Sequence, residues 1–421
     1  LAPTPTPTLA PTPTPTLAPT PTPTLAPTPT PTPITKIISN PIMGTGISLN
    51  SDKTINMNGK KTFPLMMYSL CNPGIIRAAE ECLTNLKNTD VYDVDIMGTH
   101  SSVQYLPLLL PHEKTGTYFI SRATANEDNV VKNNNYFFGY YQPDEPLDFQ
   151  HSDMVKTYKW LKENDPNHVV ITGIWKEANK WLDTADILTF AIYPFRDLLI
   201  PEYGSRDRAI YGYETLVKNN LGIDNFDNVN KPLWAVIQAV GCKDDSGVTP
   251  LSKGELRALQ YSAITMNIKG LSYYSYSWTP NDCGLFKDPK LVTMYNNAAR
   301  EIKALNDVLV LPTKDYSWEY RKGTQVSFSK KLTTNMWWLD RTNFNYMLKQ
   351  DGNIWYLIVV NKDIRPISDV GITINGLSGM MTATTIGLPE AGSVTGRKFS
   401  VSNGKFTDSF DGYGVNIYKL S

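Results

Sequence analysis

The residues of this chain that are best placed for acid–base chemistry are two adjacent carboxylates that follow an aromatic run. Asp144 and Glu145 come shortly after the segment 136–141, which reads Tyr-Phe-Phe-Gly-Tyr-Tyr, and Pro146 follows them. A carboxyl group at the end of such a strand can donate a proton when burial against aromatic rings raises its pKa. We therefore predict that Glu145 is a general acid/base, with Asp144 beside it. The alternative that both carboxylates cap the next helix stays open.

The elements that would position these carboxylates begin at residue 63, where short apolar strands alternate with longer amphipathic stretches. This alternation is typical of a parallel α/β sheet. Eight strands over about 240 residues match a (β/α)8 TIM barrel, which takes about 250, and we assign residues 63–312 to it. A doubly wound sheet fits less well, because residues 70–74 lack a glycine-rich phosphate turn. The strands are predicted at 63–69, 91–97, 117–122, 136–141, 169–175, 187–193, 233–240 and 270–278.

Helices are predicted between most of these strands, at 75–86, 152–164 and 252–267. In the last of them Ser252 is the N-cap and Glu255 completes a capping box. Before the barrel, residues 34–62 are predicted to form a hairpin lead-in, with strands at 47–50 and 54–57.

A second domain is predicted at 313–421, where apolar and polar residues alternate with a period of two. This pattern, with turns at Asp351-Gly352 and Asn403-Gly404, is typical of an antiparallel β-sandwich. Its strands are predicted at 325–329, 335–339, 354–361, 370–374, 381–386 and 414–420.

Residues 1–32 are four copies of Leu-Ala-Pro-Thr-Pro-Thr-Pro-Thr. Proline at every second position fixes φ and removes backbone donors, so residues 1–33 are predicted to form a stiff polyproline II stalk. Threonine/proline tracts are typical of O-glycosylated stalks, and a bare linker is the alternative. The repeats could also join copies of the chain into a fibre. The predicted glycosylation sites are Thr4, Thr6, Thr8, Thr12, Thr14, Thr16, Thr20, Thr22, Thr24, Thr28, Thr30 and Thr32.

The charge balance of the chain argues against a charged partner. Its 40 basic and 40 acidic residues cancel, so we expect neither nucleic acid nor an anionic membrane surface as a partner. No apolar run approaches the roughly 20 residues of a membrane helix. The 23 tyrosines and 9 tryptophans favour carbohydrate, because sugar rings stack on aromatic faces. The sequence begins at Leu1 rather than at methionine, so we expect a signal or upstream region to precede it.

The four cysteines contain no Cys-x-x-Cys pair, and only four histidines accompany them. We therefore predict no metal site and no cofactor. Cys242 and Cys283 follow adjacent predicted strands, which favours a disulfide between them in a secreted protein, with buried free thiols as the alternative. A Cys71–Cys82 bridge is less favoured, because Cys82 falls inside a predicted helix. His100 and His112 are expected to face solvent.

Three short segments carry a resemblance to a known superfamily. Asp144-Glu145-Pro146 after strand four, residues 185–194 and Ser277-Trp278 resemble motifs of the extracellular glycoside hydrolases built from a (β/α)8 barrel and a C-terminal β-sandwich. The resemblance covers roughly residues 47–421. It implies that Glu145 is the acid/base of glycosidic bond hydrolysis, and that the protein is extracellular or attached to the cell surface.

The chain departs from that superfamily where a second carboxylate is expected. Relatives take a nucleophile from strand seven, but this strand offers Gln238, and Ala191 stands where relatives often carry aspartate. Replacement candidates are Asp95, Glu177 and Asp244, or its neighbour Asp245, each of which is otherwise a loop or helix-start carboxylate.

Substrate-binding residues are predicted at strand ends, where aromatic and polar side chains can meet a sugar. Trp234 lies in mid-strand and is expected in the core. Two hypotheses follow for the whole chain: a hydrolase that uses Glu145, or a catalytically inactive barrel that forms a subunit of an O-glycosylated fibre. A weaker third is a glycan-binding C-terminal domain. The predicted substrate-binding residues are Gln238, Trp175, Tyr193, Trp278, Arg122 and Tyr140.

Overall fold

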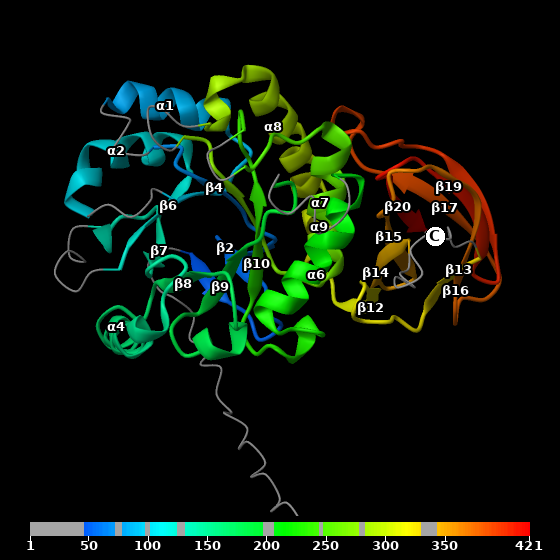
Figure 1. Ribbon diagram of the computed structural model, residues 1–421, viewed down its shortest axis with the longest axis horizontal. Helices are drawn as coiled ribbons and strands as arrows, with labels where there is room; N and C mark the ends of the chain where they lie inside the picture. The colour runs from blue at the N-terminus through cyan, green and yellow to red at the C-terminus, as the bar shows by residue number, and fades with distance from the viewer. Residues whose placement is uncertain are drawn as a thin grey trace, which may run out of the picture. The chain divides into compact units, whose positions relative to one another are not determined.

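A computed structural model of the chain describes residues 46–71, 78–96, 102–123, 131–196, 206–243, 247–277, 283–329 and 343–421. Its central feature is a closed barrel of parallel strands, as predicted (Figure 1). The ring closes because Leu271 pairs with Leu65 on one side and with Ala235 on the other. Each of the eight strands falls inside a predicted one. Their bounds are β4 Leu65–Tyr68, β5 Val94–Ile96, β6 Tyr118–Arg122, β7 Phe137–Tyr141, β8 Val169–Ile174, β9 Ile187–Ala191, β10 Leu233–Gln238 and β11 Leu271–Tyr274.

Helices cover the outside of the barrel (Figure 1). The predicted capping box of α7 is present, since Ser252 accepts from the Glu255 N–H and the Glu255 side chain accepts from the Ser252 N–H. Helices were predicted between most of the strands, but no bounds were predicted for α2, α6 or α8. The helices are α1 Ala79–Asn88, α2 Ser102–Thr115, α4 His151–Asn164, α6 Ala209–Leu221, α7 Lys253–Thr265, α8 Pro289–Ala304 and α9 Asn306–Leu309.

A small three-stranded sheet closes the N-terminal end of the barrel. It contains β1 Ile47–Leu49, β2 Ile55–Met57 and β3 Lys60–Thr62, and the predicted hairpin is its first two strands. Ile47 and Ile55 join the same apolar cluster as Trp234, which is fully buried as expected. The open end of the barrel is therefore the other one, at the C-terminal ends of the strands.

The C-terminal region is a nine-stranded antiparallel sheet that curls around its own apolar core, which matches the predicted sandwich class. The predicted strand at 335–339 lies outside the described residues, and β12, β14, β18 and β19 were not predicted. The strands are β12 Thr313–Ser317, β13 Val326–Phe328, β14 Phe344–Asp351, β15 Ile354–Asn361, β16 Ile367–Ile374, β17 Met380–Ile386, β18 Lys398–Ser402, β19 Lys405–Phe410 and β20 Val415–Leu420.

Buried ion pairs connect the barrel helices to this sheet. The ammonium of Lys362, just after β15, lies 2.7 Å from the Glu214 carboxylate on α6, and both side chains are fully buried. Arg257 on α7 pairs with Glu301 on α8 at 2.9 Å and donates to the carbonyl of Val415 at 2.6 Å. Such contacts fix the position of the C-terminal sheet against the barrel helices, because a buried charge that loses its partner destabilises the fold.

All four cysteines form disulfides. Cys242–Cys283 is confirmed, with 4.8 Å between the Cα atoms. Cys71–Cys82, the less favoured pair, is also present at 5.0 Å, because Cys82 lies in the first turns of α1. The predicted stalk and its threonines lie outside the described residues. Among the helices that the structure does describe, none combines the length and the apolar character needed to cross a membrane.

Candidate active site

The two predicted carboxylates lie at the open end of the barrel, directly after β7. The Tyr141 hydroxyl, at the end of this strand, donates to Asp144 Oδ1 at 2.9 Å. The backbone N–H of Glu145 donates to the carbonyl of Gly173 on β8 at 3.0 Å. Glu145 takes a left-handed backbone conformation with φ of 46°. Neighbouring strands therefore hold both residues at the position where active sites of such barrels are found.

Gly173 makes room for this arrangement. A Cβ atom at this position would overlap both Asp144 Oδ1 and the Tyr141 hydroxyl. A side chain on β8 here would push the carboxylate away from its hydrogen-bond donor. Glycine is required at position 173 because Asp144 approaches so closely that no side chain fits. The backbone conformation of Gly173 does not by itself require glycine.

Four tyrosines surround the mouth beside these carboxylates. The hydroxyl of Tyr68, at the end of β4, lies 2.8 Å from that of Tyr141. The Tyr68 ring meets that of Tyr274, at the end of β11, edge to face at 5.4 Å, and Tyr274 stacks on Tyr193 at 6.2 Å. Together these four tyrosines, Tyr68, Tyr141, Tyr193 and Tyr274, form an aromatic wall, in which Tyr193 and Tyr274 are half-buried.

The surroundings raise the pKa of both carboxyl groups. For Glu145 burial is the largest cause, the negative charge of Asp144 raises the pKa further, and Arg196 opposes both. For Asp144 burial again raises the pKa, against the hydrogen bonds from Tyr141 and from the Glu145 N–H. Both residues are exposed at the mouth of the barrel, and the protein groups packed beside them raise the pKa of each carboxyl group. A carboxyl group with this combination is suited to give up a proton to a bound molecule.

Of the predicted replacements for a second carboxylate, the structure describes Asp95 and Glu177. Asp95 is fully buried and accepts from the N–H groups of Leu70 and Cys71 at 2.9 and 3.1 Å, so its role is structural. Glu177 is exposed beyond β8, with Lys176 3.9 Å away. Asp244 and Asp245 lie outside the described residues.

Two predicted substrate-binding residues are turned away from the mouth. Tyr140 is buried in the layer between strands and helices, and its hydroxyl donates to Asp165 at 2.6 Å. Gln238 is also fully buried; it accepts from the Phe195 N–H at 3.2 Å and donates to the Thr249 carbonyl at 2.7 Å. The prediction was wrong for both, because neither side chain is open to a ligand. Gln238 instead ties together the loops after β9 and β10.

The other predicted aromatic and basic residues end their strands near the mouth. Tyr193 follows β9 and belongs to the aromatic wall. Trp175 follows β8 and is 40% exposed, with the Lys176 ammonium 5.1 Å from its ring. Arg122 ends β6 opposite Tyr141 and is exposed. Trp278 lies outside the described residues.

Sequence reasoning missed Tyr274 and Arg196, and it expected Tyr141 only as an aromatic residue beside Glu145. Each of them ends a strand or follows one closely, which was the only available signal. Their orientation toward Glu145 depends on which face of the strand they occupy.

One buried cluster has the residue types of a metal site. Ligand atoms of Cys71, Cys82 and His112 lie within 4.8 Å of one another. The disulfide occupies both sulfurs, and a metal needs free thiolates. The expectation that His112 faces solvent was wrong, since it is fully buried on α2 with its Nε2 3.2 Å from Asp95. His100 lies outside the described residues.

Comparison with models of known protein families gave no match. Comparison with curated protein sequences gave none either. Solved structures do match. An Anoxybacillus α-amylase, described as a new glycosyl hydrolase subclass, has a TM-score of 0.51 at 9% identity over 86% of this chain and 99% of its own. The α-amylase of Geobacillus thermoleovorans, complexed with acarbose, has 0.51 at 10% identity over 86% and 99%.

A maltogenic α-amylase, AmyB of Thermotoga neapolitana, also has a TM-score of 0.51, at 9% identity over 85% of this chain and 98% of its own. At such identities the likeness concerns the fold alone. The chain therefore has the architecture of these glycoside hydrolases, a (β/α)8 barrel followed by an antiparallel C-terminal sheet. The predicted resemblance is confirmed at that level.

Proposed function

We propose that this protein is a glycoside hydrolase that acts on a polysaccharide, with Glu145 as its general acid/base. The observation that carries the proposal is the setting of Glu145: a strand-end carboxyl group with a raised pKa, held by β8 at the open end of the barrel. In glycosidic bond cleavage such a group protonates the leaving oxygen. The fold comparison is consistent with this assignment.

Asp144 has a supporting role in the proposal. Its charge raises the pKa of Glu145, so Glu145 holds its proton to higher pH than an isolated carboxyl group would. Its own oxygen is oriented by Tyr141, which leaves a fixed partial negative charge beside the reacting bond. That charge would stabilise the positive charge that develops on the sugar ring during cleavage.

The aromatic wall supplies the means to hold a sugar. The half-buried ring of Tyr193 and the exposed ring of Trp175 flank the carboxylates at the mouth, and sugar rings stack on such faces. Arg122, which is exposed at the end of β6, would donate hydrogen bonds to hydroxyl groups of the bound sugar. A polysaccharide substrate fits this open arrangement.

We further propose an extracellular or cell-surface location. Both cysteine pairs are oxidised, which is typical of secreted proteins. The threonine/proline repeats would then act as an O-glycosylated stalk for the barrel. An intact mass of the native protein, compared with the mass of the sequence, tests the glycosylation.

The test of the hydrolase is a comparison of Glu145→Gln with the wild type on α-glucans, β-glucans and xylans. Loss of at least about 100-fold in kcat/KM is expected, since general acid catalysis contributes roughly 100- to 10,000-fold. Glu390→Gln, at an exposed position of the C-terminal domain, is the matched control and should retain full activity. Full activity of Glu145→Gln would refute the proposal.

A second candidate function is an inactive barrel that forms a subunit of a glycosylated fibre. The observation that favours it lies at the end of β10, the seventh barrel strand. Gln238 makes two hydrogen bonds to loops there and supplies no carboxylate. This candidate predicts that the wild type binds polysaccharide in affinity electrophoresis and releases no reducing sugar from it. Glu145→Gln would then bind as well as the wild type.

A further inference from the structure

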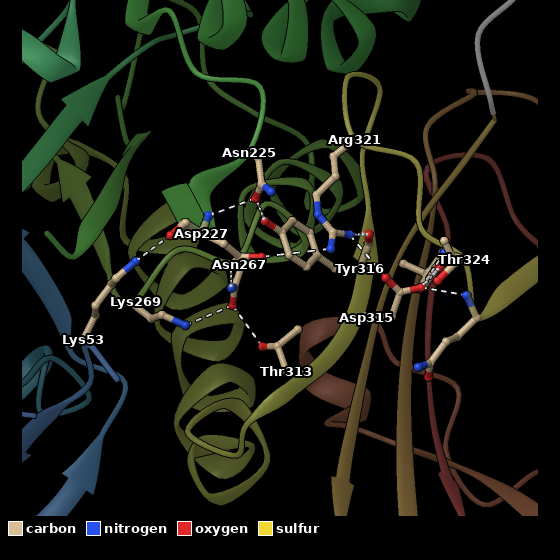
Figure 2. A network of polar contacts seen from close by, with 12 residues as sticks. Lys53, Asn225, Asp227, Asn267, Lys269, Thr313, Asp315, Tyr316, Arg321 and Thr324 are labelled. Carbon is tan, nitrogen blue, oxygen red and sulfur yellow. Dashed lines mark hydrogen bonds and ion pairs between the residues drawn. The ribbon is translucent and has the colours of Figure 1, made fainter. Parts of the chain in front are cut away.

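A pocket lies at the opposite end of the barrel from Glu145. It has a volume of about 250 Å³, and its walls come from the β1–β2 turn, the segments before β10 and β11, and the segment that leads into β12. Figure 2 shows the polar network around it, in which Lys53 reaches Asp227 and Lys269 reaches Asn267. No residue of the proposed catalytic site contributes to this pocket.

Three lysines line the pocket: Lys53, Lys231 and Lys269. Lys53 donates to the carbonyls of Asp227, at 3.1 Å, and Val229. Lys269 donates to Asn267 Oδ1 at 2.9 Å (Figure 2). These acceptors are neutral, so they satisfy hydrogen bonds without cancelling the positive charges.

Lys231 also donates to a neutral oxygen. Its ammonium lies 3.4 Å from the Tyr158 hydroxyl and 5.4 Å from the centre of that ring. The charge of Asp186 raises the pKa of Lys231. However, this carboxylate also accepts from the Tyr158 hydroxyl at 2.8 Å and lies 3.0 Å from the ammonium of Lys162.

Two carboxylates also line the pocket, and both are engaged by other groups. Asp52 pairs with Lys61 at 2.7 Å, on the β-hairpin itself. Asp227 accepts from Asn267 Nδ2 at 2.6 Å and has Arg321 4.0 Å away. Each carboxylate thus has a partner besides the three lysines, and the positive charge of the pocket is only partly offset.

Burial lowers the pKa of each of the three lysines, and the charge of Lys53 adds to this effect at Lys269. Burial, with a smaller contribution from the charge of Lys53, lowers the pKa of Lys269 to about 8 against the opposing effects of Asp227 and Asp52. Burial also lowers the pKa of Lys53 and of Lys231. Behind them, Lys349 is buried and its pKa is lowered by burial and by Lys269. A bound negative charge would favour the protonated form of each lysine.

We propose that this pocket binds a small oxyanion, such as a phosphate, sulfate or carboxylate group, between Lys53, Lys231 and Lys269. Ammonium groups that already bond neutral oxygens can add an anion's oxygen at their remaining N–H positions, since each has three donors. The anion would bridge the β1–β2 turn to the loops before β10 and β11. Its binding would therefore stabilise the closed end of the barrel.

The experiment measures binding and thermal unfolding of the whole chain with sodium sulfate, phosphate and acetate, each compared with sodium chloride at equal ionic strength. Saturable stabilisation by one of the oxyanions beyond that of chloride is expected. Lys269→Gln and Lys53→Gln should each weaken binding by about tenfold, the factor for one lost charged contact of about 1.4 kcal/mol. Lys405→Gln, an exposed lysine on β19, should bind like the wild type. Wild-type binding should weaken as the pH rises above about 8, where Lys269 loses its proton.

Lys269→Arg keeps the charge and should keep binding, which separates loss of the anion site from loss of folding. Equal stabilisation by chloride, or equal response of all variants including Lys405→Gln, would overturn the proposal, because it would show a general salt effect. The outcome is independent of the hydrolase proposal: the pocket variants should keep the hydrolytic activity of the wild type, and Glu145→Gln should keep anion binding.

Discussion

The backbone N–H of Glu145 donates to the carbonyl of Gly173, so the residue after β7 is fixed to the end of β8. This contact holds Glu145 in the left-handed region, which costs a residue with a side chain roughly 1 to 3 kcal/mol and persists only where the surroundings enforce it. Glu145 therefore combines a strained backbone with a side-chain carboxyl group whose pKa is raised. Glu177, which follows β8, is also in the left-handed region and is exposed. No catalytic role is proposed for it.

Replacing Asp144 by asparagine is expected to lower the pKa of Glu145, because the Asp144 charge now raises it. A general acid works only while protonated, so the rate falls as the pH rises through its pKa. The alkaline limb of the kcat/KM profile should move to lower pH by roughly one unit. Asp351→Asn, at an exposed turn, should leave the limb in place. An unmoved limb in Asp144→Asn would separate the two carboxylates functionally.

Alanine at Gly173 is expected to displace Asp144 and Tyr141, because its Cβ would overlap both side-chain oxygens. A displacement of about 1 Å at a catalytic group can reduce kcat/KM by roughly 100-fold. The matched control is Gly254→Ala in the first turn of α7, where a Cβ meets no atom within 4 Å. Equal activity of the two variants would show that the packing at Gly173 does not position the site.

Methionine at Lys362 would leave the Glu214 carboxylate buried without its cation. Burial already raises the pKa of Glu214, and removal of Lys362 raises it further. A carboxyl group with a raised folded pKa binds its proton more tightly when folded, so stability falls as the pH rises above the unfolded value of about 4.3. Urea unfolding at pH 7 should show a loss of about 3 to 5 kcal/mol.

This loss should shrink as the pH is lowered toward 5, where protonation removes the unpaired charge of Glu214. Glu214→Gln combined with Lys362→Met should lose less than Lys362→Met alone, since no buried charge remains. A loss that is the same at every pH would indicate a packing defect and not an unpaired charge.

Serine at both Cys242 and Cys283 is expected to lower the free energy of unfolding by about 2 to 4 kcal/mol. The bridge joins residues that are 41 positions apart and connects the loops after β10 and β11. Unfolding in urea, with the wild type as reference, measures the loss. Thiol titration of the native wild type should find no free thiol, and two reactive thiols per chain would contradict the pairing.

The barrel was predictable because its strands are buried on both faces. Such strands appear as short apolar runs between turn residues, and all eight were visible. The helix α2 was not, because Pro107 and Pro111 interrupt its sequence pattern and proline is typical of loops. For α8 a signal existed: Asp288 is its N-cap and Pro289 its first residue.

The candidate site was predictable only to the level of strand ends. The sequence located Asp144 and Glu145, but it indicated Tyr140 as a site residue, whereas the tyrosine that bonds Asp144 is Tyr141. Successive residues of a strand face opposite sides, and in a strand buried on both sides the composition does not reveal which side is inward. Gln238 was misassigned for another reason, since its partners lie in loops whose approach depends on the whole fold.

The curl of the C-terminal sheet limits how copies of this chain can associate. The two outermost strands, β12 and β13, have only five and three residues, and Asp315 of β12 accepts the N–H groups of Thr324 and Gln325 just before β13. Long unpaired margins invite strands from neighbouring molecules, and these margins are short and partly satisfied. Any lateral association through this domain would therefore depend on side-chain packing and not on extension of the backbone ladder.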